Sequence, residues 1–193
     1  MISSDFFYSL TNDAECTDWN HDEPYERHLY ATNVNCVSDT LTAIPLGVRH
    51  KFSPPVCDPS RLAFYSARWQ TNIERLYCEN IFKGKSWMTV AGELPFDEYI
   101  KEMADHKFVI SPEGSGYDCF RTWESLYCGR YPVVKRRYFT EYFSLYLPMV
   151  VIDDWDEVTE EFLLSKYDEF KSKEWNLELL SEEYWINKCQ RCK

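Results

Sequence analysis

The sequence lacks an excess of positive charge. It contains 21 Lys and Arg against 32 Asp and Glu, which gives a formal net charge of -11 at pH 7. A protein that binds mainly to a nucleic-acid backbone needs clustered Lys and Arg to neutralise phosphates, so the composition argues against such a partner. Much of the acidic excess lies between residues 153 and 183, and such a run is typical of solvated helical faces. One basic cluster, Lys135-Arg136-Arg137, either faces a phosphate or solvates a loop.

Long apolar runs are also missing. No segment approaches the ~18 consecutive apolar residues that a membrane-spanning helix requires. The first ten residues are interrupted by Ser and Asp, unlike the apolar part of a secretory signal. We therefore expect no membrane span and a cytoplasmic location. The eight Cys residues are irregularly spaced and are expected to be reduced thiols.

A complete set of metal-binding cysteines is absent as well. Cys189 and Cys192 form a C-x-x-C pair, but the sequence has no second C-x-x-C or C-x-x-H pair to complete four zinc ligands. A thioredoxin-like redox pair would lie at a helix N-terminus after a strand rather than on a tail. We therefore expect no metal and interpret the pair as part of an exposed tail.

The composition is sufficient for a core, since 45% of the residues are hydrophobic and 17% are aromatic. Short apolar runs and β character predict strands over 41–48, 61–66, 86–90, 108–110, 131–134 and 149–152. Helical spacing and end signals predict helices over 72–82, 95–103, 118–128, 156–171 and 174–187. Strands that alternate with helices indicate βαβ units. We therefore expect a doubly wound, Rossmann-like α/β fold with a parallel sheet and a C-terminal helical tail.

The predicted elements divide the chain into three parts. Residues 1–40 are polar and show little periodicity, so they are interpreted as an irregular N-terminal extension or as the remnant of another lobe. Residues 41–155 are expected to form the α/β domain. Residues 156–193 are expected to be helices that pack on it.

The candidate binding site is the segment 111–124. It follows a predicted strand and leads into a predicted helix, and ligands of open α/β sheets bind at such loops. Gly114 and Gly116 allow the backbone to approach a ligand closely and to take a positive φ where needed. Asp118 is predicted to be the N-cap of the helix. The amides at the helix start favour an anion such as a diphosphate.

Two charged residues extend this site along the predicted helix. Arg121 and Glu124 are three residues apart and therefore share a face. An Arg near the helix start can bind phosphate oxygens in a fork, and a Glu one turn further can accept hydrogen bonds from a ribose diol. The alternative is a surface ion pair of little energetic value. The segment lacks the third glycine of the dinucleotide fingerprint, which weakens a dehydrogenase interpretation.

Residues 108–134 closely resemble the C-terminal signature of exostosin-like glycosyltransferases. That signature is a strand followed by S-P-x-G-x-G-x-D, R-T-W-E-x-L and G-x-x-P-V-V, and the segment contains each part. Other segments are similar to the family in their order, namely 44–47 (I-P-L-G), 71–75, 95–100 (P-F-D-E-Y-I) and 153–155. The similarity covers residues 40–165.

The resemblance implies the donor-binding lobe of a GT-B fold. Such an enzyme transfers a sugar from a nucleoside-diphosphate sugar, of UDP or GDP type, to a hydroxyl, here expected on a glycan. It implies no metal and no further cofactor. Carried over by position, Arg121 contacts the diphosphate and Glu124 the ribose. The implied loop around the sugar and phosphates comprises Ser111, Gly114, Ser115 and Gly116, with Glu113 near it. Arg49 and Arg75 are candidates for the cleft rim, with a plain surface position as the alternative.

The acceptor half of the site is harder to find in the sequence. Candidate general bases are His50, Glu113 and Asp118. The family's N-terminal lobe, which normally supplies the acceptor site, has no clear counterpart in residues 1–40. We therefore expect either a minimal enzyme, for instance one whose acceptor lobe comes from a second subunit, identical or not, or a nucleotide-sugar-binding module without full activity. A third alternative is another phosphate-ligand enzyme built on a similar sheet.

Overall fold

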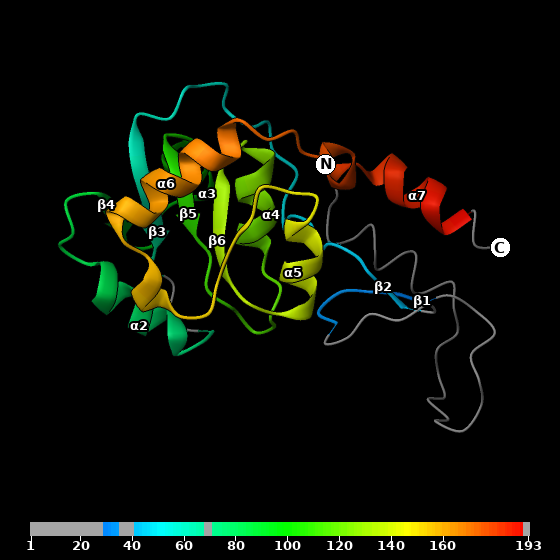
Figure 1. The fold of residues 1–193 in the computed structure, drawn as a ribbon, viewed down its shortest axis with the longest axis horizontal. Coiled ribbons are helices and arrows are strands. Elements are labelled where there is room, and N and C mark those ends of the chain that lie inside the picture. Colours follow the sequence, from blue (N-terminus) through cyan, green and yellow to red (C-terminus); the bar gives the residue numbers. More distant parts are fainter. Residues whose placement is uncertain (1–28, 35–40, 68–70, 191–193) are drawn as a thin grey trace.

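The computed structural model describes residues 29–34, 41–67 and 71–190. Its main feature is a five-stranded, all-parallel sheet in the order β4-β3-β5-β6-β7 (Figure 1). The strands are β3 (Arg61–Ser66), β4 (Met88–Ala91), β5 (His106–Ile110), β6 (Tyr131–Lys135) and β7 (Val150–Ile152). The central strands are mostly buried, as expected for a parallel sheet covered on both faces. The predicted doubly wound α/β fold is therefore confirmed.

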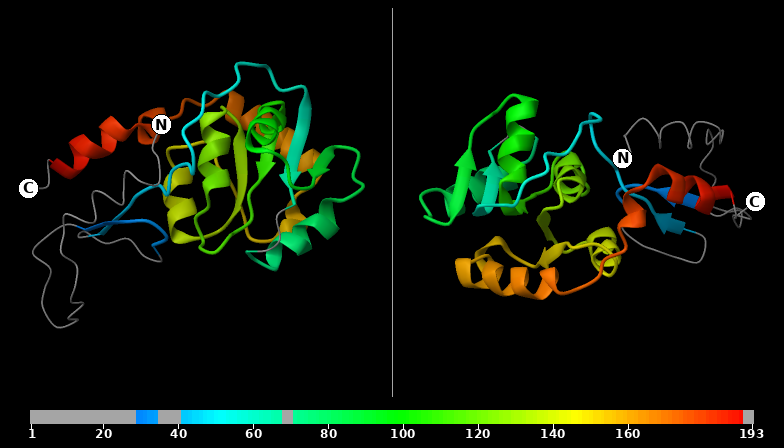
Figure 2. Two further views of the ribbon diagram at one scale, coloured as in Figure 1. Left: turned by 180° about the vertical axis from the view of Figure 1, so that it is seen from behind. Right: turned by 90° about the horizontal axis from the view of Figure 1, so that it is seen from above.

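Helices cover both faces of this sheet (Figure 2). The helices are α2 (Glu74–Phe82), α3 (Phe96–Ala104), α4 (Phe120–Tyr127), α5 (Tyr138–Ser144) and α6 (Glu160–Lys171). On one face, α2 and α6 pack on the sheet around the buried ring of Trp155. On the other face, α3 packs on Phe64 and Val109, while α4 and α5 pack around Trp123 and Phe143. The result is a three-layer arrangement.

The strand order reverses next to β3. The chain passes from β3 through α2 to β4 on one side, and α3 then returns it to β5 on the other side of β3. This is the 2-1-3-4-5 order of a doubly wound sheet, in which ligands bind beyond the carboxyl ends of the strands at the reversal. The carboxyl ends of β3 and β5 are therefore the place where this fold positions a site.

A second, two-stranded parallel sheet lies beside the main one. It pairs β1 (Leu29–Ala31) with β2 (Leu41–Ala43), and α7 (Glu182–Gln190) packs against it (Figure 1). The Tyr30 hydroxyl donates to the carbonyl oxygen of Lys188 at 3.3 Å. The predicted strand 41–48 is thus wrong in length and place, because only residues 41–43 form a strand, which lies outside the main sheet, and Val48 makes an isolated bridge. Part of the extension expected to be irregular is strand β1.

The C-terminal region also differs in detail from the predictions. The helix expected over 156–171 is divided into a 3-10 turn, η1 (Trp155–Glu157), and α6, whose N-cap Thr159 accepts a hydrogen bond from the Phe162 amide at 3.1 Å. The helix expected over 174–187 is divided into η2 (Leu177–Leu180) and α7. Helix α6 packs on the main sheet, whereas α7 covers the small sheet and contacts α5 through the rings of Trp185 and Phe143.

Candidate functional site

A cavity of about 730 Å³ lies at the carboxyl ends of β3 and β5. Its wall combines segments that are distant in sequence: the end of β3 with the start of α2, the loop after β2, the β4–α3 connection, and the loop from β5 into α4. The volume is within the range of pockets that hold small molecules. The cavity therefore occupies the position at which doubly wound sheets bind ligands.

Arg121 lies at the centre of the strand reversal. Its Nη1 donates to the carbonyl of Ile110, the last residue of β5, at 3.2 Å, and its Nη2 donates to the carbonyl of Ser66, the last residue of β3, at 2.8 Å. The guanidinium also lies 5.4 Å from the ring of Tyr65. Only 6% of the residue is exposed, yet it lines the cavity. Arg121 thus holds the two strand ends together and brings a cation to the cavity wall.

Arg75 brings a second cation to the same cavity. It is the second residue of α2, as Arg121 is the second residue of α4, so each helix that follows a switch-point strand supplies one. Arg75 Nε donates to the Glu113 carbonyl at 2.8 Å. Burial lowers the pKa of Arg75, and the positive charge of Arg121 lowers it further. The two cations therefore repel each other, and an anion between them would relieve that repulsion.

The loop between β5 and α4 needs its glycines for space. The Gly114 amide donates to the Gly116 carbonyl at 3.1 Å, which folds the loop back on itself. A Cβ atom on Gly116 would lie 2.6 Å from Asn33 Oδ1, and one on Gly114 would lie 3.0 Å from Arg75 Nη2. Neither glycine has a positive φ, so the left-handed conformation allowed for in the sequence is not used. Gly114, Ser115 and Gly116 all line the cavity.

Replacing Gly116 by alanine is expected to lower the free energy of unfolding by about 1–3 kcal/mol, because the added methyl group overlaps Asn33. Asn33 cannot move away freely, since its Oδ1 accepts a hydrogen bond from the Asp118 amide at 2.7 Å. Urea denaturation would measure the change. The matched control is Gly92→Ala, where a Cβ meets nothing within 4 Å. Equal stabilities of the two variants would contradict the steric explanation.

Ser111 and Glu113 do not line the cavity, and their side chains hold the loop through contacts with other side chains. The Ser111 hydroxyl lies 2.9 Å from Thr122 Oγ1 and 3.2 Å from Cys119 Sγ. The Glu113 carboxylate is paired with Arg137 at 2.7 Å. Burial raises the pKa of Glu113, while Arg137 opposes the shift. Both residues were expected around the ligand, but their side chains contact other protein groups and not the cavity.

Glu124 lines the cavity one helical turn beyond Arg121 and is 5% exposed. Its Oε2 accepts a hydrogen bond from the Tyr99 hydroxyl at 3.0 Å. Burial and the Glu124 charge raise the pKa of Tyr99 well above its ordinary value, so this hydroxyl keeps its proton. The sequence pointed to Tyr99 only as part of an apolar helix face. In the structure it fixes the carboxylate at the cavity wall.

Asp118 is not the N-cap of α4, contrary to the prediction. The helix begins at Phe120, and the N-cap residue Cys119 makes no side-chain capping bond. The Asp118 carboxylate instead accepts hydrogen bonds from Trp123 Nε1 at 2.8 Å and from the Leu46 amide at 2.9 Å. Burial raises the pKa of Asp118 to about 7, although these hydrogen bonds oppose the shift. Asp118 thus joins α4 to the loop after β2, and its catalytic role stays a prediction.

The loop after β2 contributes Arg49 and His50 to the cavity wall. Both residues are exposed. The His50 ring meets the Phe96 ring edge-on, with 5.5 Å between centroids. The cavity wall therefore includes two of the three candidate bases, His50 and Asp118.

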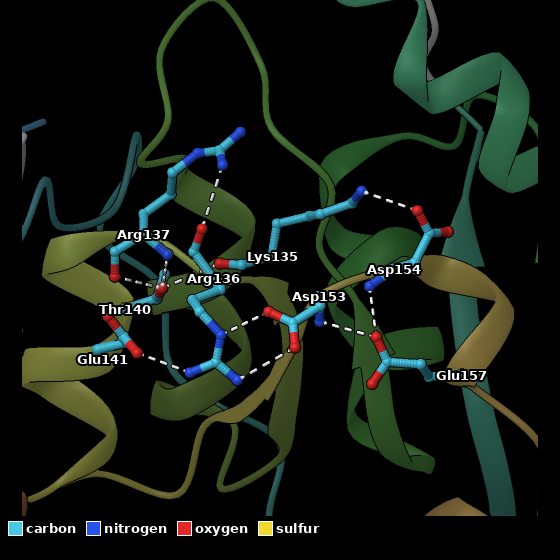
Figure 3. Close-up of polar contacts among 8 residues, drawn as sticks. All are labelled: Lys135, Arg136, Arg137, Thr140, Glu141, Asp153, Asp154 and Glu157. Carbon is cyan, nitrogen blue, oxygen red and sulfur yellow. Dashed lines mark hydrogen bonds and ion pairs between the residues drawn. The ribbon is translucent and has the colours of Figure 1, made fainter.

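The basic cluster 135–137 is paired with carboxylates and does not line the cavity. Figure 3 shows Arg136 between Asp153 and Glu141, and Lys135 beside Asp154. The pairs are Lys135 with Glu74 and Asp154, Arg136 with Asp153 and Glu141, and Arg137 with Glu113. Of the two alternatives for this cluster, the contacts favour support of surface loops over direct phosphate binding.

Three further observations concern only the described part of the chain. No group of three or more His, Cys, Asp or Glu side chains in residues 29–34, 41–67 and 71–190 is placed to hold a metal ion. In the same ranges, every helix is too short or too polar to cross a bilayer. None of the described cysteines, Cys189 among them, forms a disulfide bond. Cys189 lies in α7 and is half-buried, which differs from the exposed tail predicted for the C-x-x-C pair, and Cys192 lies outside the described residues.

Sequence comparison adds no family assignment to this geometry. No model of a known protein family matches the chain, and no curated protein matches it.

Proposed function

We propose that the chain binds a nucleoside-diphosphate sugar in this cavity and transfers the sugar to a hydroxyl acceptor, as exostosin-like glycosyltransferases do. The observation that carries the proposal is the meeting of Arg75 and Arg121 at the strand reversal. Each comes from the first turn of a helix that follows a switch-point strand. Two cations beside an uncapped helix N-terminus make a site for a doubly charged anion.

The cavity wall divides into regions that match such a ligand. The diphosphate lies against the two arginines and the loop 114–116. The ribose lies one helical turn further, where the buried Glu124 carboxylate accepts its hydroxyl groups. During transfer, negative charge develops on the departing diphosphate, and the fixed guanidinium groups stabilise that charge more strongly than they stabilise the bound donor.

A second candidate function is nucleotide-sugar binding without transfer. It is favoured by the contacts of the candidate bases. The Asp118 carboxylate already accepts hydrogen bonds on both oxygens, and the Glu113 carboxylate is paired with Arg137 outside the cavity wall. His50 is then the remaining candidate at the wall for removing the acceptor proton.

Calorimetry and thermal unfolding with UDP, GDP and their sugars test the proposal. We expect at least one nucleotide to stabilise the protein, by about 2.7 kcal/mol at 100 times its Kd. Glu124→Gln should lower the affinity for that nucleotide at least tenfold, because the amide nitrogen cannot accept a hydrogen bond from a ribose hydroxyl. The control is Glu161→Gln, the same change at an exposed position of α6. No stabilisation by any of these ligands would sink both functions, whereas binding without donor turnover would favour the second.

A further inference from the structure

We infer that the Ser66 hydroxyl binds a phosphate oxygen of the ligand between Arg75 and Arg121. The inference rests on the proposed function for the nucleotide, although the phosphate subsite itself can be tested without one. Neither the sequence motifs nor the resemblance points to Ser66. It was expected only as the end of a strand.

The first observation is an unpartnered polar atom. Ser66 is 1% exposed, and its Oγ has no hydrogen-bond partner among the described residues. Buried hydroxyl groups in native proteins nearly always have a partner, because leaving one without a partner costs free energy. Ser66 also lines the cavity. A ligand group in the cavity can therefore supply the partner that the protein does not.

The second observation is the charge around that hydroxyl. Ser66 is the last residue of β3, and its own carbonyl accepts the hydrogen bond from Arg121 Nη2 at 2.8 Å. The preceding residue, Tyr65, donates from its hydroxyl to the carbonyl of Arg75 at 2.6 Å. Both arginines are thus anchored at the end of the strand that carries Ser66.

The chemistry of this subsite selects an anionic oxygen. Two guanidinium groups and a hydroxyl are all hydrogen-bond donors, and a phosphoryl oxygen accepts from several donors at once. A neutral sugar hydroxyl is instead favoured near a carboxylate, to which it can donate a hydrogen bond. The Glu124 carboxylate provides such an acceptor one helical turn away. Ser66 therefore belongs to the phosphate end of the cavity.

The test compares Ser66→Ala with Ser125→Ala. Ser125 is a buried serine outside the cavity wall, and its hydroxyl donates to the Arg121 carbonyl at 2.6 Å. Calorimetry with pyrophosphate, with UDP and GDP, and with uridine and guanosine measures affinity, and thermal unfolding measures stability. Ser66→Ala should lower the affinity for pyrophosphate, UDP and GDP about 10- to 100-fold and leave the affinity for the nucleosides unchanged. Its melting temperature without ligand should not fall, because the change removes an unpaired hydroxyl.

The other outcomes separate this inference from the proposed function. Unchanged pyrophosphate affinity in Ser66→Ala would overturn the inference, and so would an equal loss of affinity for the nucleosides, which would place the contact on the nucleoside. A wild-type protein that binds pyrophosphate but no nucleotide would contradict the proposed function, while the Ser66 effect on pyrophosphate would still support the subsite. A wild-type protein that binds neither would overturn both.

Discussion

Arg121→Ala is expected to weaken nucleoside-diphosphate binding by about 100-fold and to lower the free energy of unfolding by about 2–4 kcal/mol. The two effects have separate causes. Binding falls because a buried cation is lost from the phosphate subsite. Stability falls because the carbonyls of Ile110 and Ser66 lose their donors. Calorimetry gives the first effect, and urea denaturation of the same preparation gives the second.

The matched control for this variant is Arg130→Ala. Arg130 is also buried, and its guanidinium donates to the carbonyls of Ala104 at 2.7 Å and Cys57 at 2.6 Å. It precedes β6 and lies at the amino ends of the strands, away from the cavity. Arg130→Ala should therefore lose similar stability and retain ligand affinity. If both variants bound the nucleotide equally well, Arg121 would be a purely structural arginine.

Stability is expected to fall as the pH rises from about 4 to about 7, because of Asp118. The pKa of its carboxyl group is raised from 3.8 to about 7 in the folded protein, chiefly by burial. Between these values the folded protein holds a proton that the unfolded chain has released. Raising the pH therefore favours unfolding, by about 1.4 kcal/mol for each unit of pKa difference and on the order of 4 kcal/mol in total. The loss is complete about one pH unit above the folded pKa.

Asp118→Asn isolates this contribution because the amide does not ionise. Asparagine resembles the protonated carboxyl group, so the stability of the variant should lack this fall between pH 4 and pH 8. The quantity to measure is the difference between the unfolding free energies of the wild type and the variant, by urea denaturation at pH 5 and pH 8. A difference that did not change with pH would show that the carboxyl group titrates alike in both states.

The sequence was sufficient for the main sheet because its strands are short apolar runs between clear turn residues. It failed where an element depends on distant contacts. Residues 41–48 are apolar enough for a strand in the main sheet. Residues 41–43 instead pair with β1 in the small sheet. Helix α5 was missed although Phe139 and Phe143 have helical spacing, since tyrosines on both sides of the segment obscure the period.

The part of the candidate site that lies in one contiguous segment was predictable from the sequence. Residues 114–116 and 121–124 are contiguous and follow a strand, so their position at the sheet edge followed from the pattern. Two of the wall residues that the sequence did not single out, Ser66 and Tyr99, carry no motif. Ser66 matters only because β3 lies beside β5 at the strand reversal, and Tyr99 because α3 packs next to α4. Such roles arise from packing between segments that the sequence does not relate.

The small sheet has a consequence for how the chain folds during synthesis. Tyr30 of β1 donates a hydrogen bond to the carbonyl of Lys188 in α7, and the two residues are 158 positions apart in the chain. The ribosome therefore releases β1 and β2 long before α7 exists to cover them, whereas the β3–β7 sheet can close from segments made one after another. Contacts of such high sequence separation form late and slowly. During that interval the nascent chain exposes apolar residues such as Ala31 and Ala43, and we expect these exposed strands to favour association with chaperones.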